Sequence, residues 1–175
     1  WGQTIGFNSN CSDLEETRCL GFTDYPKIET CQFAPCSDSS YCWYKKLDNG
    51  SFTIVSGASE ADYQTVAGDF NGAGTYTFKR CYSCGNDPCS DQIASNCSYE
   101  VTVVVNPLPT PGITVAETSG TTNNDGIICQ GATATLTASG GGTYVWSTTG
   151  TTAAISVNSA GTFSVTVEDA NGCIA

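Results

Sequence analysis

Short runs of alternating apolar and polar residues occur along the whole chain, and turn-forming residues separate them. The clearest run is Tyr99–Val105, in which every second residue is tyrosine or valine. A period of two is typical of a β-strand with one buried face. The only suggestion of a helix is Ser12–Cys19, where Ser12 and Glu15 have the spacing of a capping box. The pattern therefore predicts an all-β protein.

The predicted strands fall into two groups. In the first group we expect strands at Ser40–Leu47, Phe52–Val55, Tyr63–Val66, Thr75–Cys81 and Tyr99–Val105. In the second we expect Gly112–Val115, Thr133–Ala138, Thr143–Ser147, Ala153–Val157 and Thr162–Glu168. Turn signals such as Asn-Gly and Ser-Gly lie between them. Many short strands divided by turns are typical of β-sandwiches.

One sequence phrase occurs twice, which indicates a modular protein. The segment Asn71–Phe78 has the sequence NGAGTYTF, and Asn158–Val165 has NSAGTFSV. Each copy runs from a turn cluster directly into an alternating strand. Trp43 and Trp146 lie on central strands of the two groups, so we expect two copies of one structural unit.

Prolines at alternate positions divide the two groups. Pro107, Pro109 and Pro111 each lack the N–H that a sheet ladder needs, so they favour a stiff extended linker. The expected organisation is an N-terminal cysteine-containing segment, a first domain, a linker and a second domain, at residues 1–28, 29–106, 107–111 and 112–175.

Charge and composition exclude several functions. The net charge is −11 and there are only six Lys and Arg residues, so neither nucleic acid nor an anionic membrane surface is an expected partner. The chain has no histidine, and the neighbouring carboxylates Glu168 and Asp169 would point to opposite faces of a strand. No run of roughly 18 apolar residues suggests membrane insertion. We predict a protein that is not an enzyme and has no cofactor.

Eleven cysteines indicate an oxidising compartment, so we expect an extracellular or cell-surface protein. The simplest pairing joins Cys129 to Cys173 in the second domain and, by analogous placement, Cys31 to Cys97 in the first. Three local bridges and one unpaired thiol are then shared among Cys11, Cys19, Cys36, Cys42, Cys81, Cys84 and Cys89. The two-residue gap between Cys81 and Cys84 also suits zinc, but the wider spacing of Cys89 and Cys97 favours disulfides.

Several phrases together carry a family resemblance. Ile128–Thr137, Tyr144–Ser147 and Val167–Cys173 closely resemble the PKD-like and Ig-like repeats of large bacteroidete surface proteins, including gliding-motility adhesins and other type IX secretion cargo. The resemblance covers residues ~30 to 175. It implies two tandem Ig-like sandwiches, stapled by disulfides, in a structural or adhesive module whose partners are adjoining repeats or neighbouring fibre subunits.

The chain also departs from that pattern. Phe78 and Val165 stand where an antibody-type domain has a cysteine, and Cys81–Asn96 is an insertion between the last two strands of the first domain. The resemblance would demand another strand after Cys173. We therefore expect either a piece cut from a longer array, as Trp1 at the start also suggests, or a strand supplied by another molecule.

Two weaker binding sites complete the expectations. Asp169 and Asn171 offer oxygen ligands for Ca²⁺, although a type I′ turn at Asn171–Gly172 explains the motif without a metal. Tyr44 and Tyr82 could stack on sugar rings of surface glycans. The alternative function is thus a carbohydrate-binding accessory module of a secreted enzyme, with the cysteine-rich insertion as its recognition loop.

Overall fold

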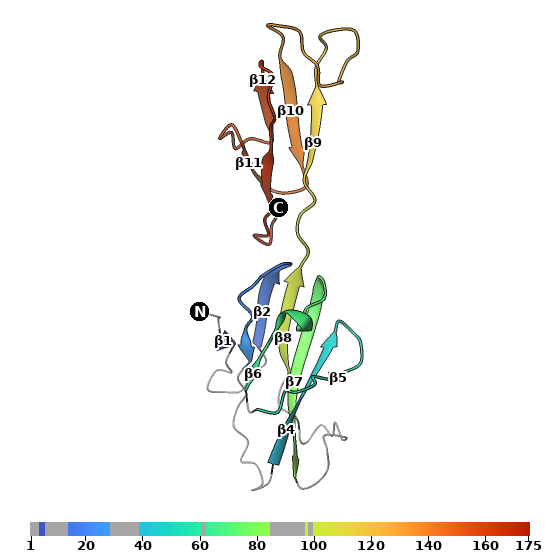
Figure 1. Ribbon diagram of the computed structural model, residues 1–175, viewed down its shortest axis with the longest axis vertical. Coiled ribbons are helices and arrows are strands. Elements are labelled where there is room, and N and C mark those ends of the chain that lie inside the picture. Colours follow the sequence, from blue (N-terminus) through green and yellow to red (C-terminus); the bar gives the residue numbers. More distant parts are fainter. Residues whose placement is uncertain (1–3, 6–13, 29–38, 61, 85–96, 98–99) are drawn as a thin grey trace. The chain divides into compact units, whose positions relative to one another are not determined.

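The computed structural model describes residues 4–5, 14–28, 39–60, 62–84, 97 and 100–175 (Figure 1). For residues 4–5, 14–15, 39–40 and 82–84 it describes the backbone alone. The chain forms two compact units, Trp1–Pro107 and Leu108–Ala175. The prediction of an all-β fold is confirmed, since every regular element in the described residues is a strand apart from one turn of 3₁₀ helix, η1 (Ala67–Asp69).

Unit 1 contains two sheets. The larger sheet has the strand order β2-β8-β7-β4-β5. Its strands are β2 (Leu14–Cys19), β8 (Val101–Asn106), β7 (Gly74–Cys84), β4 (Ser39–Leu47) and β5 (Thr53–Ile54). The smaller sheet has the order β1-β3-β6, with β1 (Thr4–Ile5), β3 (Lys27–Ile28) and β6 (Tyr63–Gln64).

Both sheets of unit 1 contribute to one hydrophobic core. Ile28 comes from the smaller sheet, whereas Trp43 and Phe78 come from the larger one, and all three are completely buried. On β8 the alternation is strict, because the inward valines at 101, 103 and 105 are at most 2 % exposed. Burial of one face of each sheet explains why period-two sequence patterns located these strands.

Strand β2 replaces the helical turn that Ser12–Cys19 suggested. It pairs in parallel with β8 over six register positions, from Leu14↔Val101 to Cys19↔Asn106. A helix of two turns is marginal in water, whereas each residue of an edge strand gains a ladder partner. Through β2 and β3, residues of the N-terminal segment become part of the sheets of unit 1.

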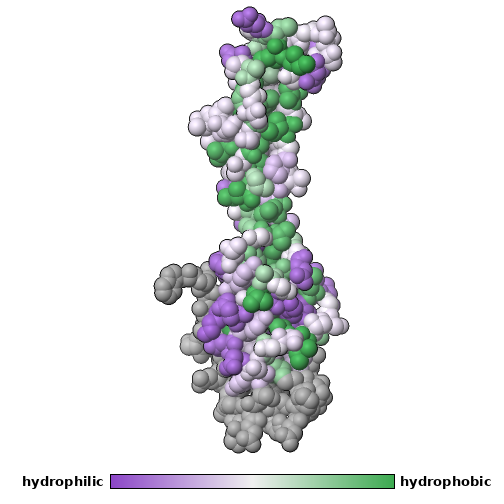
Figure 2. Space-filling model, in the orientation of Figure 1, coloured by the Kyte–Doolittle hydropathy of each residue, from purple (hydrophilic) through white to green (hydrophobic). Residues whose placement is uncertain are grey.

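Unit 2 is built from five short strands in two sheets. One sheet has the order β12-β10-β9 and the other pairs β11 with β13. Their bounds are β9 (Gly112–Ala116), β10 (Ala134–Ser139), β11 (Thr143–Trp146), β12 (Ala154–Val157) and β13 (Val165–Glu168). Leu136, Ala138 and Trp146 form its core. In the view of Figure 2, hydrophilic residues gather more on unit 1 than on unit 2, where Lys and Arg are absent from the sequence.

The duplicated phrase adopts different lengths of strand in the two units. In unit 1 the strand begins at Gly74, and β8 pairs with it from Gly74↔Val105 to Phe78↔Val101. In unit 2 the corresponding strand begins only at Val165, four residues after the equivalent Gly161. The repeated phrase therefore forms the longer strand in unit 1, where β8 pairs with it from Gly74 onward.

Candidate functional site

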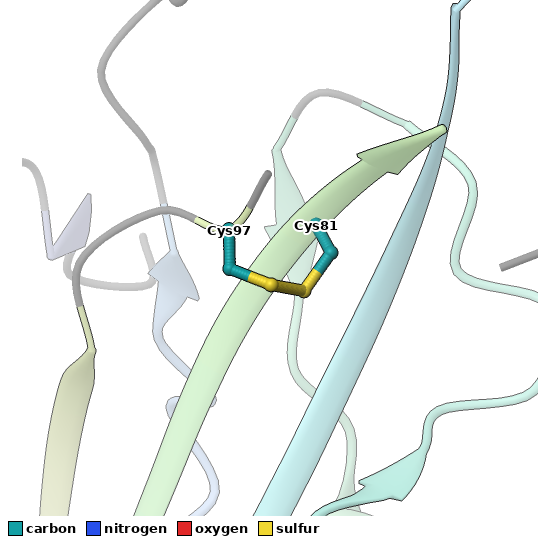
Figure 3. Close-up of a disulfide and its surroundings, with 2 residues drawn as sticks. All are labelled: Cys81 and Cys97. Atoms are coloured by element: carbon teal, nitrogen blue, oxygen red, sulfur yellow. A yellow bond between two sulfur atoms is a disulfide. The ribbon is translucent and has the colours of Figure 1, made fainter. Parts of the chain in front are cut away.

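A disulfide joins strand β7 of unit 1 to Cys97, which precedes strand β8 in the chain. Cys81 on β7 is bonded to Cys97, and their Cα atoms are 3.9 Å apart (Figure 3). The two residues face each other in an isolated antiparallel bridge. The predicted pairing of Cys31 with Cys97 is therefore wrong, because strand pairing places Cys97 directly opposite Cys81. Cys31 itself lies outside the described residues.

The predicted bridge between Cys129 and Cys173 is also wrong. Cys129 is a free, exposed thiol, whereas Cys173 is completely buried and belongs to a disulfide. Cys129 begins a turn in which its carbonyl accepts the N–H of Ala132, and its own N–H is held by the Ser119 hydroxyl. These bonds keep it on an exposed loop.

Of the other predicted disulfide cysteines, Cys19 and Cys42 are disulfide-bonded. The side chain of Cys84 is not described, and Cys11, Cys36 and Cys89 lie outside the described residues. These disulfides are compatible with an extracellular protein. Within the described parts of the chain, no helix has the length and apolar character needed to cross a membrane.

Of the two tyrosines proposed for sugar stacking, only Tyr44 has a described side chain. Tyr44 is only 3 % exposed and packs with Cys42 and Cys81, so the structure contradicts its proposed role. Tyr44 lies on the same face of β4 as Cys42, and the Cys81–Cys97 disulfide packs beside both residues, so the ring is shielded from solvent. Tyr82 lies on β7 opposite Tyr41, and its side chain is outside the described part.

The weak calcium candidate forms a tight turn. The carboxylate of Asp169 accepts the backbone N–H groups of Asn171 at 2.8 Å and Cys173 at 2.9 Å. Gly172 follows with a φ of 77°, which glycine adopts without strain. The side chain of Asp169 thus organises the turn. Among the described residues, no cluster of three or more His, Cys, Asp or Glu side chains could hold a metal ion.

A buried carboxylate network lies at η1. Asp69 is 3 % exposed, and it accepts hydrogen bonds from the Lys45 ammonium, the Tyr63 hydroxyl and the Val66 N–H at 2.8, 2.8 and 2.9 Å. Lys45 also donates to the carbonyl of Gly68. The network joins β4 to the connection between β6 and β7. Burial, followed by the hydrogen bond and the negative charge of Asp69, raises the pKa of Tyr63 well above its usual 10.0.

This shift predicts a loss of stability in alkali. A raised pKa means that the folded state favours neutral Tyr63, so its contribution is complete below the unfolded pKa near 10 and is lost as pH rises above it. In Tyr63→Phe we expect a basal loss of about 1 kcal/mol and a flatter decline between pH 10 and 12. Urea denaturation of thiol-alkylated protein at each pH measures both. Equal slopes for the two proteins would contradict the assignment.

Two lysine ammonium groups share one aromatic ring on the other face of the large sheet. The Nζ atoms of Lys46 and Lys79 lie 4.6 and 4.0 Å from the centroid of the Phe52 ring. Lys46 also contacts the carboxylate of Glu100 at 3.4 Å. The dipeptides Lys45-Lys46 and Lys79-Arg80 were visible in the sequence, but only the register of β4 and β7 brings them together.

Unit 2 has an apolar pocket of about 650 Å³ beside its free thiol. Val115, Leu136, Val157, Phe163 and Cys129 line it. One wall belongs to a loop that the buried carboxylate of Glu117 organises by accepting the N–H groups of residues 119 and 125. The pocket is thus part of an ordered end of the unit.

No family model, curated protein or solved structure matches this chain.

Proposed function

We propose that the chain is a structural and adhesive module of an extracellular surface protein, fibre or stalk, built from two tandem Ig-like sandwiches. Its partners are adjoining repeats of the same polypeptide or neighbouring fibre subunits. It bears tension and mediates attachment, and no catalytic role is proposed. The observation that carries this proposal is the parallel pairing of β2 with β8 in unit 1.

The geometry of that pair suits a load-bearing role. The chain enters β2 at Leu14 and leaves β8 at Asn106, and the two strands run in the same direction. Tension that pulls the two chain ends apart therefore slides one strand along the other and loads all six register positions together. The Cys81–Cys97 disulfide also limits how far unit 1 can extend, because it closes a segment with a sequence separation of 16 residues.

Three local features support the Ig-like part of the proposal. The order β8-β7-β4-β5 corresponds to strands G, F, C and C′ of a variable-type sheet. The hydroxyl of Tyr76 donates to the carbonyl of Gly72 at 2.9 Å, as in a tyrosine corner. Ile28, Trp43 and Phe78 are buried together in the core of unit 1. In antibody domains the corresponding part of the core contains an inter-sheet disulfide that packs on a tryptophan.

A proline substitution in β2 tests the mechanical role. The N–H of Leu20 donates to the carbonyl of Asn106, so by the two-residue period Glu16 also directs its N–H toward β8, whereas Thr17 directs its N–H away. We expect Glu16→Pro to lower the force that unfolds unit 1 and to reduce its stability by about 1 kcal/mol. Single-molecule pulling from the chain ends measures the force.

Two controls accompany that test. Thr17→Pro adds the same ring on the open edge of β2 and is expected to keep most of the force. Glu16→Ala removes the ion pair with Arg18 but retains the backbone N–H. If all three variants unfold at the wild-type force, β2 and β8 do not bear the load and the mechanical proposal fails.

The alternative, a carbohydrate-binding accessory module, is favoured by one observation. A small hollow lies at the β4–β5 turn, and its lining residues include Lys45, Ser51 and Asn71. Its hydroxyl, amide and ammonium groups are suited to a sugar. This hollow also suits the adhesive part of the leading proposal.

A further inference from the structure

Strand β13 of unit 2 has a complete neighbour on one side only. On that side it pairs with β11 along its whole length. On the other side Ile174 faces Glu168 in an isolated antiparallel bridge, and the backbone N–H and C=O groups of Val167 bond to Ala175 at 2.9 and 3.0 Å. Among the described residues, this second ladder goes no further along β13 than Val167.

Val165 directs its backbone toward the open side of β13. The carbonyl of Ser164 accepts the N–H of Ser147 from the β11 side, and successive residues of an antiparallel strand bond to opposite sides. Val165 therefore presents its N–H and C=O on the same side as Val167, and no described residue bonds to them there. Such groups on a strand edge are a template for another strand.

The apolar pocket of unit 2 adjoins this open side. Phe163, two residues before Val165, lines it together with Val115 and Leu136 of the other sheet. Phe163 and Val165 pack against the same core cluster, so they share the inner face. Ile127, which also lines the pocket, is 70 % exposed. A strand added beside β13 would therefore direct every second side chain into an apolar hollow of about 650 Å³.

Unit 1 shows which kind of strand fills the equivalent position. In the duplicated phrase, Tyr76 and Phe78 correspond to Phe163 and Val165. Strand β8 pairs antiparallel with both, and the valines opposite them, at positions 103 and 101, are at most 1 % exposed. The occupant that fits unit 2 is thus a strand with β-branched apolar residues at alternate positions. A small apolar ligand would fill the pocket but leave the backbone groups of Val165 without partners.

We propose that the open side of β13 and the apolar pocket bind an extended segment of a neighbouring subunit that has valine or isoleucine at alternate positions. The segment runs antiparallel to β13, continues the ladder that Ala175 begins, and places its apolar side chains opposite Val165 and Phe163. Its intervening residues face solvent and are polar. This inference rests on the proposed function, for which it names the contact between fibre subunits. It is independent of whether β2 and β8 bear load.

Binding is expected to lengthen β13. In unit 1, with β8 beside it, the repeated phrase is a strand from Gly74 onward, whereas in unit 2 the strand begins at Val165. A paired segment would extend the strand toward Gly161, the equivalent of Gly74. The N–H groups of Phe163 and Val165 would then be hydrogen-bonded and protected from exchange with solvent.

The test measures binding of the 175-residue chain to a synthetic peptide with the sequence of Tyr99–Asn106, which contains β8. We expect saturable binding by calorimetry, slower amide exchange at Phe163 and Val165 by NMR, and a higher unfolding temperature for unit 2 alone. A control peptide has threonine in place of the valines at 101 and 103. It keeps the β-propensity but loses apolar contact, so it is expected to bind about tenfold more weakly.

Val165→Pro tests the backbone pairing. It removes the N–H that faces the open side and is expected to lower the affinity for the peptide about tenfold. Ser156→Pro is the matched control on edge strand β12. The N–H of Ala138 donates to the carbonyl of Ala153, so by the two-residue period Ser156 directs its own N–H away from β10. Ser156→Pro is expected to bind like the wild type.

Phe163→Ala tests the apolar pocket and is expected to lower the affinity about tenfold, because the peptide loses an apolar wall. Val145→Ala is its control. Val145 is 54 % exposed on β11 and does not line the pocket, so this variant is expected to bind like the wild type. Circular dichroism confirms that each variant is folded.

Several results would overturn the proposal. Protected amides at Phe163 and Val165 in the chain alone would show that a segment of the same chain already covers this side. Absence of binding up to about 1 mM peptide, equal binding of the threonine peptide, or equal losses in Val165→Pro and Ser156→Pro would each exclude a paired strand. Unfolding forces measured in parallel show separately whether the load-bearing role holds.

Discussion

Replacing Trp43 with alanine is expected to lower the free energy of unfolding of unit 1 by about 4 kcal/mol, within the usual range for deleting a large buried aromatic side chain. Trp43 is completely buried between the two sheets, and its ring centroid lies 5.6 Å from that of Tyr63. Its indole N–H donates to the carbonyl of Glu60 at 3.0 Å. The substitution therefore opens a cavity and leaves a polar group without its partner. Denaturation in guanidinium, followed by circular dichroism, measures the loss.

Trp146→Ala is the matched variant in unit 2. Trp146 is 2 % exposed, and its indole N–H donates to the carbonyl of Thr152 at 2.9 Å, so each unit has the same arrangement. We expect each substitution to lower the transition of its own unit and to leave the other unchanged. If either variant shifted both transitions equally, the two units would unfold cooperatively and the independence of their cores would be wrong.

Alternation in the sequence located the long strands because burial of one face is a local, repeating constraint. Thr143–Ser147, for example, was predicted within one residue of β11. The strands at Lys27–Ile28 and Thr4–Ile5 were not predicted, because a strand of two residues is too short to show an alternation of apolar and polar positions. Strand β2 was not predicted for another reason. Its residues Glu15, Glu16 and Arg18 are as common on helices as on an exposed sheet edge.

The candidate site depends on contacts that spacing does not encode. Cys81 and Cys97 pair because the chain returns beside β7, and the sequence offered several other partners with similar spacing. Lys46 and Lys79 meet at Phe52 only because the β4–β7 register places them diagonally across the sheet. Sequence patterns predicted which faces are polar, but the register decided which polar residues meet.

Asp69→Ala is expected to destabilise unit 1 by about 3 kcal/mol. The carboxylate is 3 % exposed and is the common acceptor for Lys45, Tyr63 and the Val66 N–H. Its removal leaves three donors without their partner, two of them partly shielded from water, and breaking a buried pair from one side costs about 3–5 kcal/mol. We place the effect at the lower end because the Lys45 side chain remains 25 % exposed and can reach solvent. Urea denaturation measures the loss.

Asp62→Ala separates burial from ion pairing. Asp62 contacts Lys27 at 2.9 Å, nearly the distance between Asp69 and Lys45, but its side chain is 38 % exposed against 3 % for Asp69. If burial sets the cost, Asp62→Ala loses less than about 1 kcal/mol while Asp69→Ala loses several times more. Similar losses in the two variants would mean that the lysine contact itself dominates. The hydrogen bonds from Tyr63 and Val66 would then contribute little to holding η1 against the sheet.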